Sequence, residues 1–451
     1  MSPILTPGGR RRRRWPWVLG GLVLVAGVAV AAYLVFVKAP GDVSHPDVEF
    51  TAPQKAPPKG QKTNTGYDWP LYGYDLGRTR YLPGVKLRPP FVRAWTRAGS
   101  HLIEFQPVLA SGRLFYQKNN GELYSVSAAS GRVRWRRRVG GLSASAPAVA
   151  GGKVYAVSNK GGAGGIAGAG PGRVVALDAR TGKVRWSKRL ASASESSPLA
   201  HSGRLYLGSQ DGTVYCLLAK SGRIVWRYKA SGAVKAGPAF SANRVFVAAY
   251  GGTVTALRAS NGSVIWRSGT SGRSFGRAGN FYGTPAVAFG RVYAGNTDGR
   301  VYSFAASSGK LAWSHSMGAF VYGAAAVADV PGMRPAVFVG SYSGRFSALD
   351  ARSGAVIWNK GGYGKISGAP SVIGDVVYFS SLSQRRTYAL GARTGRTLWS
   401  LGRGAFNPAI SDGIRVYITG YGSEYAFTTK AQLAKDRADQ RRLRRAGAKK
   451  R

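Results

Sequence analysis

Tryptophan recurs along this chain at intervals of 40 to 51 residues, and this period constrains the fold more than any other feature. The last seven of eight such residues end closely similar phrases, of which AKSGRIVW and ARSGAVIW are two. A fixed period of this length means that one supersecondary unit is repeated many times. The eight residues are Trp95, Trp135, Trp186, Trp226, Trp266, Trp313, Trp358 and Trp399.

Each repeat predicts four short β-strands. A small-Pro-small segment such as SAPAVA opens the unit, and an alternating run such as GRLYLGSQ follows it. A tight turn such as Asp211-Gly212 or Asp298-Gly299 leads to a third run, and a Ser/Thr-Gly turn leads to the strand that ends in tryptophan. These turn residues tolerate the positive φ of two-residue hairpins. Four short strands in about 40 residues indicate one blade of a β-propeller.

The phase of the repeat predicts the number of blades. Eight segments open in the same way, but the eighth ends near residues 425–427 without a tryptophan strand. At the other end, residues 91–95 form a tryptophan strand with no blade before it. The first strand would therefore complete the last blade and remove a free sheet edge. We expect an all-β, eight-bladed propeller of four-stranded blades over residues 67–428.

The A-x-x-[ST]-G-x-x-x-W phrase resembles the tryptophan-docking motif of pyrroloquinoline-quinone-type (PQQ-like) propeller repeats. Residues 69–83 are also similar to the segment that precedes the propeller in quinoprotein dehydrogenases, so the resemblance covers roughly residues 67–428. That family includes calcium- and quinone-dependent dehydrogenases. It also includes non-catalytic propellers, among them the lipoprotein subunit of the outer-membrane protein assembly machine. The resemblance implies a fold and leaves the function open.

We predict a structural role for the eight tryptophans. A ring at the end of an outer strand packs against the neighbouring blade, and its N–H donates to a backbone carbonyl. Burial of about 200 Å² of apolar surface contributes a few kcal/mol per site as an upper estimate. Every repeat carries one such residue, whereas a ligand site would need only a few.

The N-terminal region predicts a membrane anchor. Residues 1–14 are basic and end in five arginines, and the apolar residues 15–37 would span about 34 Å as a helix. The arginines place the N-terminus in the cytoplasm, so we expect one transmembrane helix, a plasma-membrane location and an extracytoplasmic propeller. The alternative is a cleaved signal peptide with Ala29-Val30-Ala31 at the cleavage site, which would give a secreted protein.

Two further segments and the overall charge bear on partners. Residues 38–66 read as a Pro/Lys-rich linker, and residues 429–451 as a basic C-terminal tail. With 65 basic and 18 acidic residues, the net charge of +47 should attract polyanions. Outside the membrane these would be anionic lipid or wall polymer, and no motif indicates nucleic acid. Alternatively, the charge is compositional and binds nothing specific.

The irregular loops indicate one candidate face for binding. Insertions at residues 160–173 and 268–283 fall on loops that should open on the same face of the propeller. Function concentrates on irregular loops over a rigid scaffold, and aromatic residues with arginine are typical of interfaces. The alternative is that these loops pack on themselves. The candidate partner-binding residues are Arg273, Phe275, Arg277, Phe281, Tyr282, Phe320, Tyr322 and Tyr363.

The sequence argues against an enzyme. The resemblance implies that a dehydrogenase would need calcium-binding carboxylate and amide groups, a catalytic aspartate, an arginine and usually two adjacent cysteines. Cys216 is the single cysteine, and most acidic residues fall at repeat turns. Glu104, Glu195 and Asn280 belong to the candidate face but are isolated in the sequence. We assign no catalytic, cofactor-binding or metal residue, and we expect neither pyrroloquinoline quinone nor calcium.

Three functional hypotheses follow. The preferred one is a non-catalytic, membrane-anchored extracytoplasmic propeller that acts as a protein-interaction scaffold in the cell envelope. The second is a module that binds or senses an anionic envelope polymer, or a small ligand over the central channel. The third, less favoured, is a quinone-dependent dehydrogenase. Salt-resistant protein partners would indicate the first, salt-sensitive binding the second, and quinone-dependent dye reduction the third.

Overall fold

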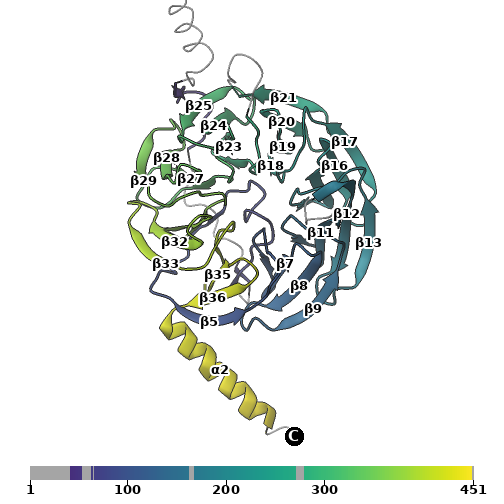
Figure 1. Ribbon diagram of the computed structural model, residues 1–451, viewed down its shortest axis with the longest axis vertical. Helices are drawn as coiled ribbons and strands as arrows, with labels where there is room; N and C mark the ends of the chain where they lie inside the picture. The colour runs from purple at the N-terminus through teal and green to yellow at the C-terminus, as the bar shows by residue number, and fades with distance from the viewer. Residues whose placement is uncertain (1–40, 53–61, 64–65, 162–166, 271–278, 449–451) are drawn as a thin grey trace, which may run out of the picture.

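Eight sheets, each with four antiparallel strands, surround a common axis in the computed structural model (Figure 1), which describes residues 41–52, 62–63, 66–161, 167–270 and 279–448. Each sheet contains four strands that pair in order from the inside outward, so the predicted all-β, eight-bladed propeller is confirmed. Two blades carry an additional strand, and a separate hairpin joins β2 (Lys62–Thr63) to β3 (Gly66–Tyr67).

The strands of the first four blades are β6 (Val108–Ala110), β7 (Arg113–Gln117), β8 (Glu122–Ser127) and β9 (Val133–Arg138); β10 (Ala148–Ala150), β11 (Lys153–Gly161), β12 (Ala167–Asp178) and β13 (Val184–Arg189); β14 (Leu199–His201), β15 (Arg204–Gly208), β16 (Thr213–Leu218) and β17 (Ile224–Lys229); β18 (Ala239–Ser241), β19 (Arg244–Ala249), β20 (Thr253–Arg258) and β21 (Val264–Gly269). Those of blades five to seven are β22 (Ala286–Ala288), β23 (Arg291–Gly295), β24 (Arg300–Ala305) and β25 (Leu311–Ser316); β26 (Ala326–Ala328), β27 (Ala336–Gly340), β28 (Phe346–Asp350) and β29 (Val356–Lys360); β30 (Ser371–Ile373), β31 (Val376–Ser381), β32 (Arg386–Gly391) and β33 (Thr397–Leu401).

Blade eight closes the ring with strands from both ends of the propeller. It contains β34 (Ile410–Ser411), β35 (Val416–Thr419) and β36 (Glu424–Thr428), and its outer strand is β5 (Val92–Arg97). The register pairs Ala426 with Trp95. The prediction that the N-terminal strand completes the last blade is therefore confirmed, and β5 covers the edge of β36, which would otherwise be unpaired.

The repeated phrase works as a joint between neighbouring blades. The Trp313 indole N–H donates to the Ala351 carbonyl of the next blade over 3.0 Å. Gly354 lies beneath the same ring with φ of +76°, and a Cβ there would lie 2.7 Å from it. One phrase thus supplies a carbonyl and a glycine to the preceding blade, and its own tryptophan docks on the following blade. The same bond links Trp95 to Ala128, Trp135 to Ala179, Trp186 to Ala219, Trp226 to Ala259, Trp266 to Ala306 and Trp358 to Ala392.

The eighth junction is built differently, because β36 and β5 are not consecutive in the chain and no Ser/Thr-Gly turn joins them. Trp399 instead meets two phenylalanine rings edge-on, Phe91 at 5.6 Å and Phe427 at 5.3 Å between centroids. The helix α2 (Lys430–Ala448) begins directly after this blade and points away from the ring (Figure 1).

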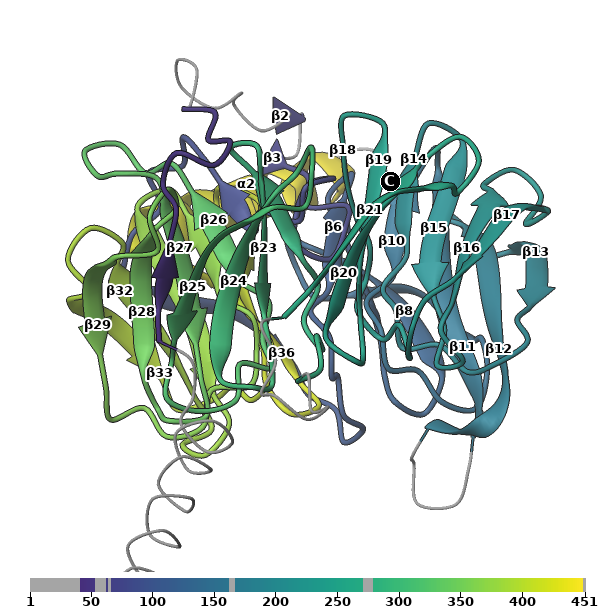
Figure 2. The same cartoon turned by 90° about the horizontal axis from the view of Figure 1, so that it is seen from above.

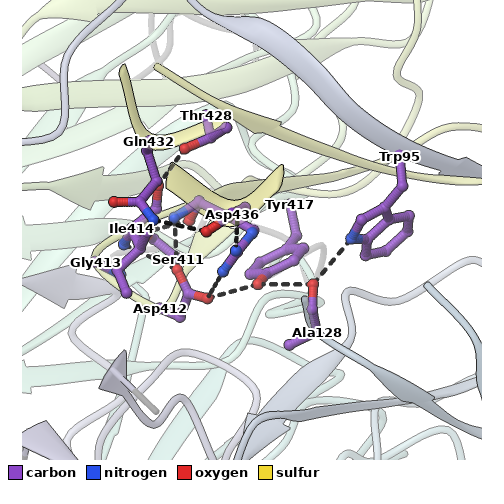
Figure 3. A network of polar contacts seen from close by, with 11 residues as sticks. Trp95, Ala128, Ser411, Asp412, Gly413, Ile414, Tyr417, Thr428, Gln432 and Asp436 are labelled. Atoms are coloured by element: carbon purple, nitrogen blue, oxygen red, sulfur yellow. Dashed lines mark hydrogen bonds and ion pairs between the residues drawn. The ribbon is translucent and has the colours of Figure 1, made fainter. Parts of the chain in front are cut away.

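A polar network ties α2 to the closing blade (Figure 3). The Arg415 guanidinium is almost fully buried and forms ion pairs with Asp412 and with Asp436 of α2. The Tyr417 hydroxyl donates to Asp412 over 2.6 Å, and its oxygen lies 3.2 Å from the Ala128 carbonyl oxygen. The same carbonyl oxygen accepts a hydrogen bond from the indole N–H of Trp95 in β5. Blade eight, blade one and the C-terminal helix are therefore joined through one set of side chains.

Part of the predicted linker lies against blade five. Strand β1 (Val43–Ser44) pairs with the outer strand β25, and Phe50 packs against Phe289 at 5.8 Å. Arg291 donates to the backbone carbonyls of Val48 and Glu49. The stretch has too little apolar surface to fold alone, but a sheet edge offers it backbone hydrogen bonds that need no hydrophobic side chains.

The segment from Tyr67 to Leu82 winds around the propeller axis. Backbone N–H groups on the innermost strands donate to its carbonyl oxygens over 2.7–2.9 Å: Leu109 to Trp69, Val149 to Pro70, Phe240 to Leu76, Val287 to Gly77, Val327 to Thr79 and Val372 to Arg80. Its last residues form β4 (Tyr81–Leu82), which pairs with β30 in parallel. This axial segment covers the inner edges of the blades, which would otherwise present unpaired backbone groups.

The predicted transmembrane helix at residues 15–37 lies outside the described residues. Within the described part of the chain, no helix has both the length and the apolar character needed to span a membrane.

Candidate functional site

A cavity of about 290 Å³ opens on the axis, on the face that carries the loops between blades. Tyr72 of the axial segment borders it, together with residues that precede the innermost strands of several blades. Figure 2 shows the propeller from the side, with the inner strands running between its two faces. We refer to this cavity as the axial pocket.

The pocket walls come from one equivalent position of the repeat. Glu104, Glu195 and Lys235 each stand three residues before the proline that opens a blade, and Tyr282 does the same. Tyr322 stands three residues before Ala325, which replaces that proline in blade six. In a propeller, equivalent positions of successive blades lie around the axis at the same height. Residues far apart in the chain thus form one ring.

Lys235 and Glu195 form the one ion pair in the wall among the described residues. The Lys235 ammonium lies 3.0 Å from Glu195 Oε1, and Gln210 donates to the same oxygen over 2.7 Å. The ammonium also stands over the rings of Tyr250, at 5.7 Å, and Tyr282, at 5.9 Å. Carboxylate and aromatic faces together hold this cation, and a partly desolvated cation–π contact contributes about 1–2 kcal/mol.

Glu104 is the second carboxylate of the pocket. Burial raises its pKa, the negative charge of Glu195 raises it further, and Lys235 partly opposes both effects. No hydrogen bond to the Glu104 carboxylate is found within the described ranges. Tyr282 is affected by both acids: burial raises its pKa, and the charges of Glu195 and Glu104 add to the rise. The two acids, the lysine and the phenol thus interact as one group.

Aromatic rings continue from the pocket to its rim. Tyr282 contacts Tyr322 edge-on at 5.5 Å between centroids, and Tyr322 contacts Tyr342 at 4.8 Å. Phe320 lies 5.8 Å from Tyr322 and is 49% exposed. The Lys365 ammonium stands over Tyr342 at 5.9 Å. These four rings, Phe320, Tyr322, Tyr342 and Tyr282, are called the aromatic rim below.

Residues 91–170 and 170–401 match the protein family described as outer membrane protein assembly factor BamB. The chain belongs to this family. No curated protein sequence matches the chain.

Solved structures agree on the fold. The crystal structure of BamB from Moraxella catarrhalis is 19% identical with a TM-score of 0.60, and the match covers 75% of this chain and 99% of that one. A quinohemoprotein alcohol dehydrogenase from Pseudomonas putida is 14% identical with a TM-score of 0.66 and 80% of both chains covered. The one from Comamonas testosteroni is also 14% identical, with a TM-score of 0.65 and coverage of 82% of this chain and 81% of that one. At these identities the likeness concerns the fold alone.

The candidate residues predicted from the sequence separate into groups. Tyr282 and Tyr322 line the pocket, and Phe320 lies at its rim. Phe281 has no exposed surface and packs against Tyr302 at 6.0 Å, so it is a core residue that a partner cannot reach. Tyr363 packs against Phe379 and Tyr388 at 4.9 and 4.8 Å. Arg273, Phe275 and Arg277 lie outside the described residues. Asn280 accepts from the Gly251 N–H and does not line the pocket.

The sequence pattern does not indicate three of the pocket residues, Lys235, Tyr342 and Tyr72, and it shows the two acids only as isolated groups. Beneath the pocket, the Arg78 guanidinium is fully buried and donates to the carbonyls of Pro238, Ser197 and Pro198 over 2.9–3.2 Å. Burial lowers its pKa to about 9, and the neighbouring Arg80 charge contributes. Carbonyl oxygens, with their partial negative charge, solvate the guanidinium, and the nearby Asp75 charge opposes the fall in its pKa.

The pocket does not carry the residue set that the quinoprotein resemblance implies. Across the described residues, no three His, Cys, Asp or Glu side chains are close enough to hold a metal ion together. Cys216 is a buried free thiol, so no pair of adjacent cysteines exists. Asn407 borders the pocket, but its amide donates to the Ile103 carbonyl. The donors present do not fit a calcium–quinone site, which needs several converging oxygens.

Proposed function

We propose that this protein is a non-catalytic, protein-interaction scaffold of the cell envelope, and that its partner binds over the aromatic rim. Membership of the BamB family, whose description names an assembly factor, supports a role among envelope proteins. The single observation that carries the proposal is the exposed Phe320 at the end of a chain of packed aromatic rings.

The rim has the character of an interface centre. Aromatic anchors with nearby cations are enriched where proteins bind each other, and few such residues supply most of the binding energy. Phe320 is held by contacts with Tyr322 and with Tyr342, whose centroid lies 6.4 Å away. A ring already held in place loses little conformational entropy on binding. Rigid rings at the mouth of a cavity therefore favour a protein partner over non-specific adhesion.

The proposal also includes a membrane anchor at the N-terminus and an extracytoplasmic location of the propeller. Five arginines followed by 23 apolar residues support a single membrane span with the N-terminus in the cytoplasm. The propeller would then face the extracytoplasmic side. The non-catalytic assignment rests on the residues of the pocket, which lack a metal cluster within the described chain.

A second candidate function is binding of an anionic lipid or wall polymer. The observation that favours it is α2, which extends from the ring and exposes Arg437, Arg441 and Arg442. Each basic residue near an anionic surface contributes about 1 kcal/mol. This binding would be salt-sensitive and independent of the aromatic rim.

Crosslinking and affinity capture of the full-length protein from its own membranes tests the two candidates. Capture is compared at low and high salt for the native protein, for Phe320→Ser and for Val184→Ser, which removes an apolar residue 57% exposed on the outer strand β13. Protein partners that survive high salt and are lost only with Phe320→Ser would support the scaffold. Capture that collapses with salt and is equal in both variants would refute it in favour of the polyanion candidate.

A further inference from the structure

The axial pocket has more acidic than basic side chains in its wall, although the chain as a whole is strongly basic. The chain has 65 basic and 18 acidic residues, yet two carboxylates and one lysine line this cavity. Glu195 forms an ion pair with Lys235 and accepts a hydrogen bond from Gln210. Glu104 faces the same cavity and receives no hydrogen bond from any described residue. The positive charge that acts on Glu104 is that of Lys235, which is already paired with Glu195, so Glu104 lacks a hydrogen-bonded cation of its own among the described residues.

The contacts of Lys235 show which groups of this pocket bind a cation. Its ammonium contacts a carboxylate oxygen at 3.0 Å and two tyrosine faces at 5.7 and 5.9 Å. Around Glu104 the same two kinds of group recur. Phe105 is its neighbour in the chain and meets Tyr72 edge-on at 5.6 Å, and both rings border the cavity. A second cation would find a carboxylate and aromatic surface together, which is the environment that ammonium and guanidinium groups prefer.

We propose that the axial pocket binds an organic cation, with an ammonium or guanidinium group beside Glu104 and its apolar part among the aromatic rings. A volume of about 290 Å³ suits a group of side-chain size. A divalent metal ion does not fit, because it would need more oxygen ligands than Glu104 provides. An anion does not fit either, because the Arg78 and Arg80 side chains are fully buried below the pocket and do not border it.

The cation could come from two sources with the same chemistry. It could be a free small molecule, or a lysine, arginine or N-terminal amine of a partner protein that docks on the aromatic rim. The inference does not rest on the proposed scaffold function, because the binding of a small cation is measured without any partner.

The test is calorimetric titration of the full-length protein with butylammonium, butanol and butyrate, which share one carbon chain and differ in charge. We expect butylammonium to bind at least about tenfold more tightly than the other two, the usual effect of one charge-assisted hydrogen bond. Glu104→Gln should remove this preference. Glu122→Gln, which changes an acid of the same blade outside the pocket, should keep it. Lys235→Met should raise the affinity severalfold, because it frees Glu195 for the ligand.

Thermal melting of each variant checks that the fold is intact, and Lys235→Met provides a gain of binding that a misfolded protein could not give. Equal binding of all three probes, or butylammonium binding that is unchanged in Glu104→Gln, would overturn the proposal. The peptide Gly-Lys-Gly with both ends blocked then separates the sources. Tighter binding than butylammonium would assign the site to a partner's side chain, and weaker binding would assign it to a free cation.

Discussion

Glu424 lies in β36 of the closing blade and has no exposed surface. Thr419 Oγ1 donates to its Oε1 over 2.9 Å, whereas Oε2 has no hydrogen-bond partner among the described residues. Burial raises the pKa of Glu424 to about 8, although the Thr419 hydrogen bond and the Lys118 charge act to lower it. In the unfolded chain the same group would ionise near its usual pKa of about 4.3. Folding therefore takes up a proton at neutral pH.

The sign of the pH dependence follows from this difference. Between the two pKa values the folded protein binds one more proton than the unfolded chain, so the free energy of unfolding falls as pH rises. The stabilisation is complete below about pH 4.3 and is lost by about pH 8. Each pH unit between them costs up to about 1.4 kcal/mol, so the loss from pH 5 to pH 8 is about 4 kcal/mol at most. Glu424→Gln keeps the shape and cannot ionise, so it should escape this loss.

Urea unfolding of the full-length protein at pH 5, 6, 7 and 8 measures the effect. The native protein and Glu424→Gln should be similar at pH 5, and the variant should be more stable by about 2–4 kcal/mol at pH 8. Glu122→Gln is the control. Burial raises the pKa of Glu122, but hydrogen bonds from Asn120 and Tyr124 and the Arg136 charge lower it overall, so the stabilisation from this group is lost only as pH falls below about 4.3. The difference between the native protein and Glu122→Gln should therefore stay constant from pH 5 to pH 8. A difference between native protein and Glu424→Gln that is constant from pH 5 to pH 8 would refute the reasoning.

Two further predictions concern the joints between blades. Gly354→Ala places a methyl group 2.7 Å from the Trp313 ring, at a residue with φ of +76°, so the melting temperature should fall by several degrees. Gly361→Ala is the control: Gly361 has open space around it, so this variant should change the melting temperature far less. Equal melting temperatures of the two variants would contradict the docking role of this glycine. Asp436→Asn weakens the tie between α2 and Arg415, so hydrogen exchange should accelerate in blade eight and stay unchanged in blade four. Exchange that accelerates equally in both blades would argue against a local clamp.

The blade number was predictable because each tryptophan phrase marks the end of a strand, and because two incomplete fragments remained at the ends of the repeat. The axial segment and the docking of β1 were not predictable in the same way. Both depend on backbone hydrogen bonds to sheet edges, which leave no pattern in side-chain types. Arg78 and Arg80 illustrate the difficulty, because in the sequence they look like ordinary exposed charges, whereas the structure buries both.

The candidate site was predictable in part. Its face and two of its tyrosines follow from the loop pattern, but the ring formed by Glu104, Glu195 and Lys235 does not follow from local sequence. The signal is present, since all three stand at the same distance before the proline of their blades. This common spacing indicates a shared site only when it is known that equivalent positions of the repeat converge on the propeller axis. Phe281 and Tyr282 are neighbours in the chain, and only packing decides that one enters the core and the other the pocket.

The docking of β1 on blade five would set how far the propeller can move from the membrane span proposed at residues 15–37. Asp42 accepts from the Ser316 N–H at the end of β25, directly before the loop that carries Phe320 and Tyr322. If the span ends at Val37, the chain up to Asp42 can reach about 18 Å at full extension. The pocket face would then stay within a thin layer above the lipid. A partner that is itself held at the membrane would meet it by searching in two dimensions, at a high effective concentration, whereas a freely diffusing one would have to enter that layer.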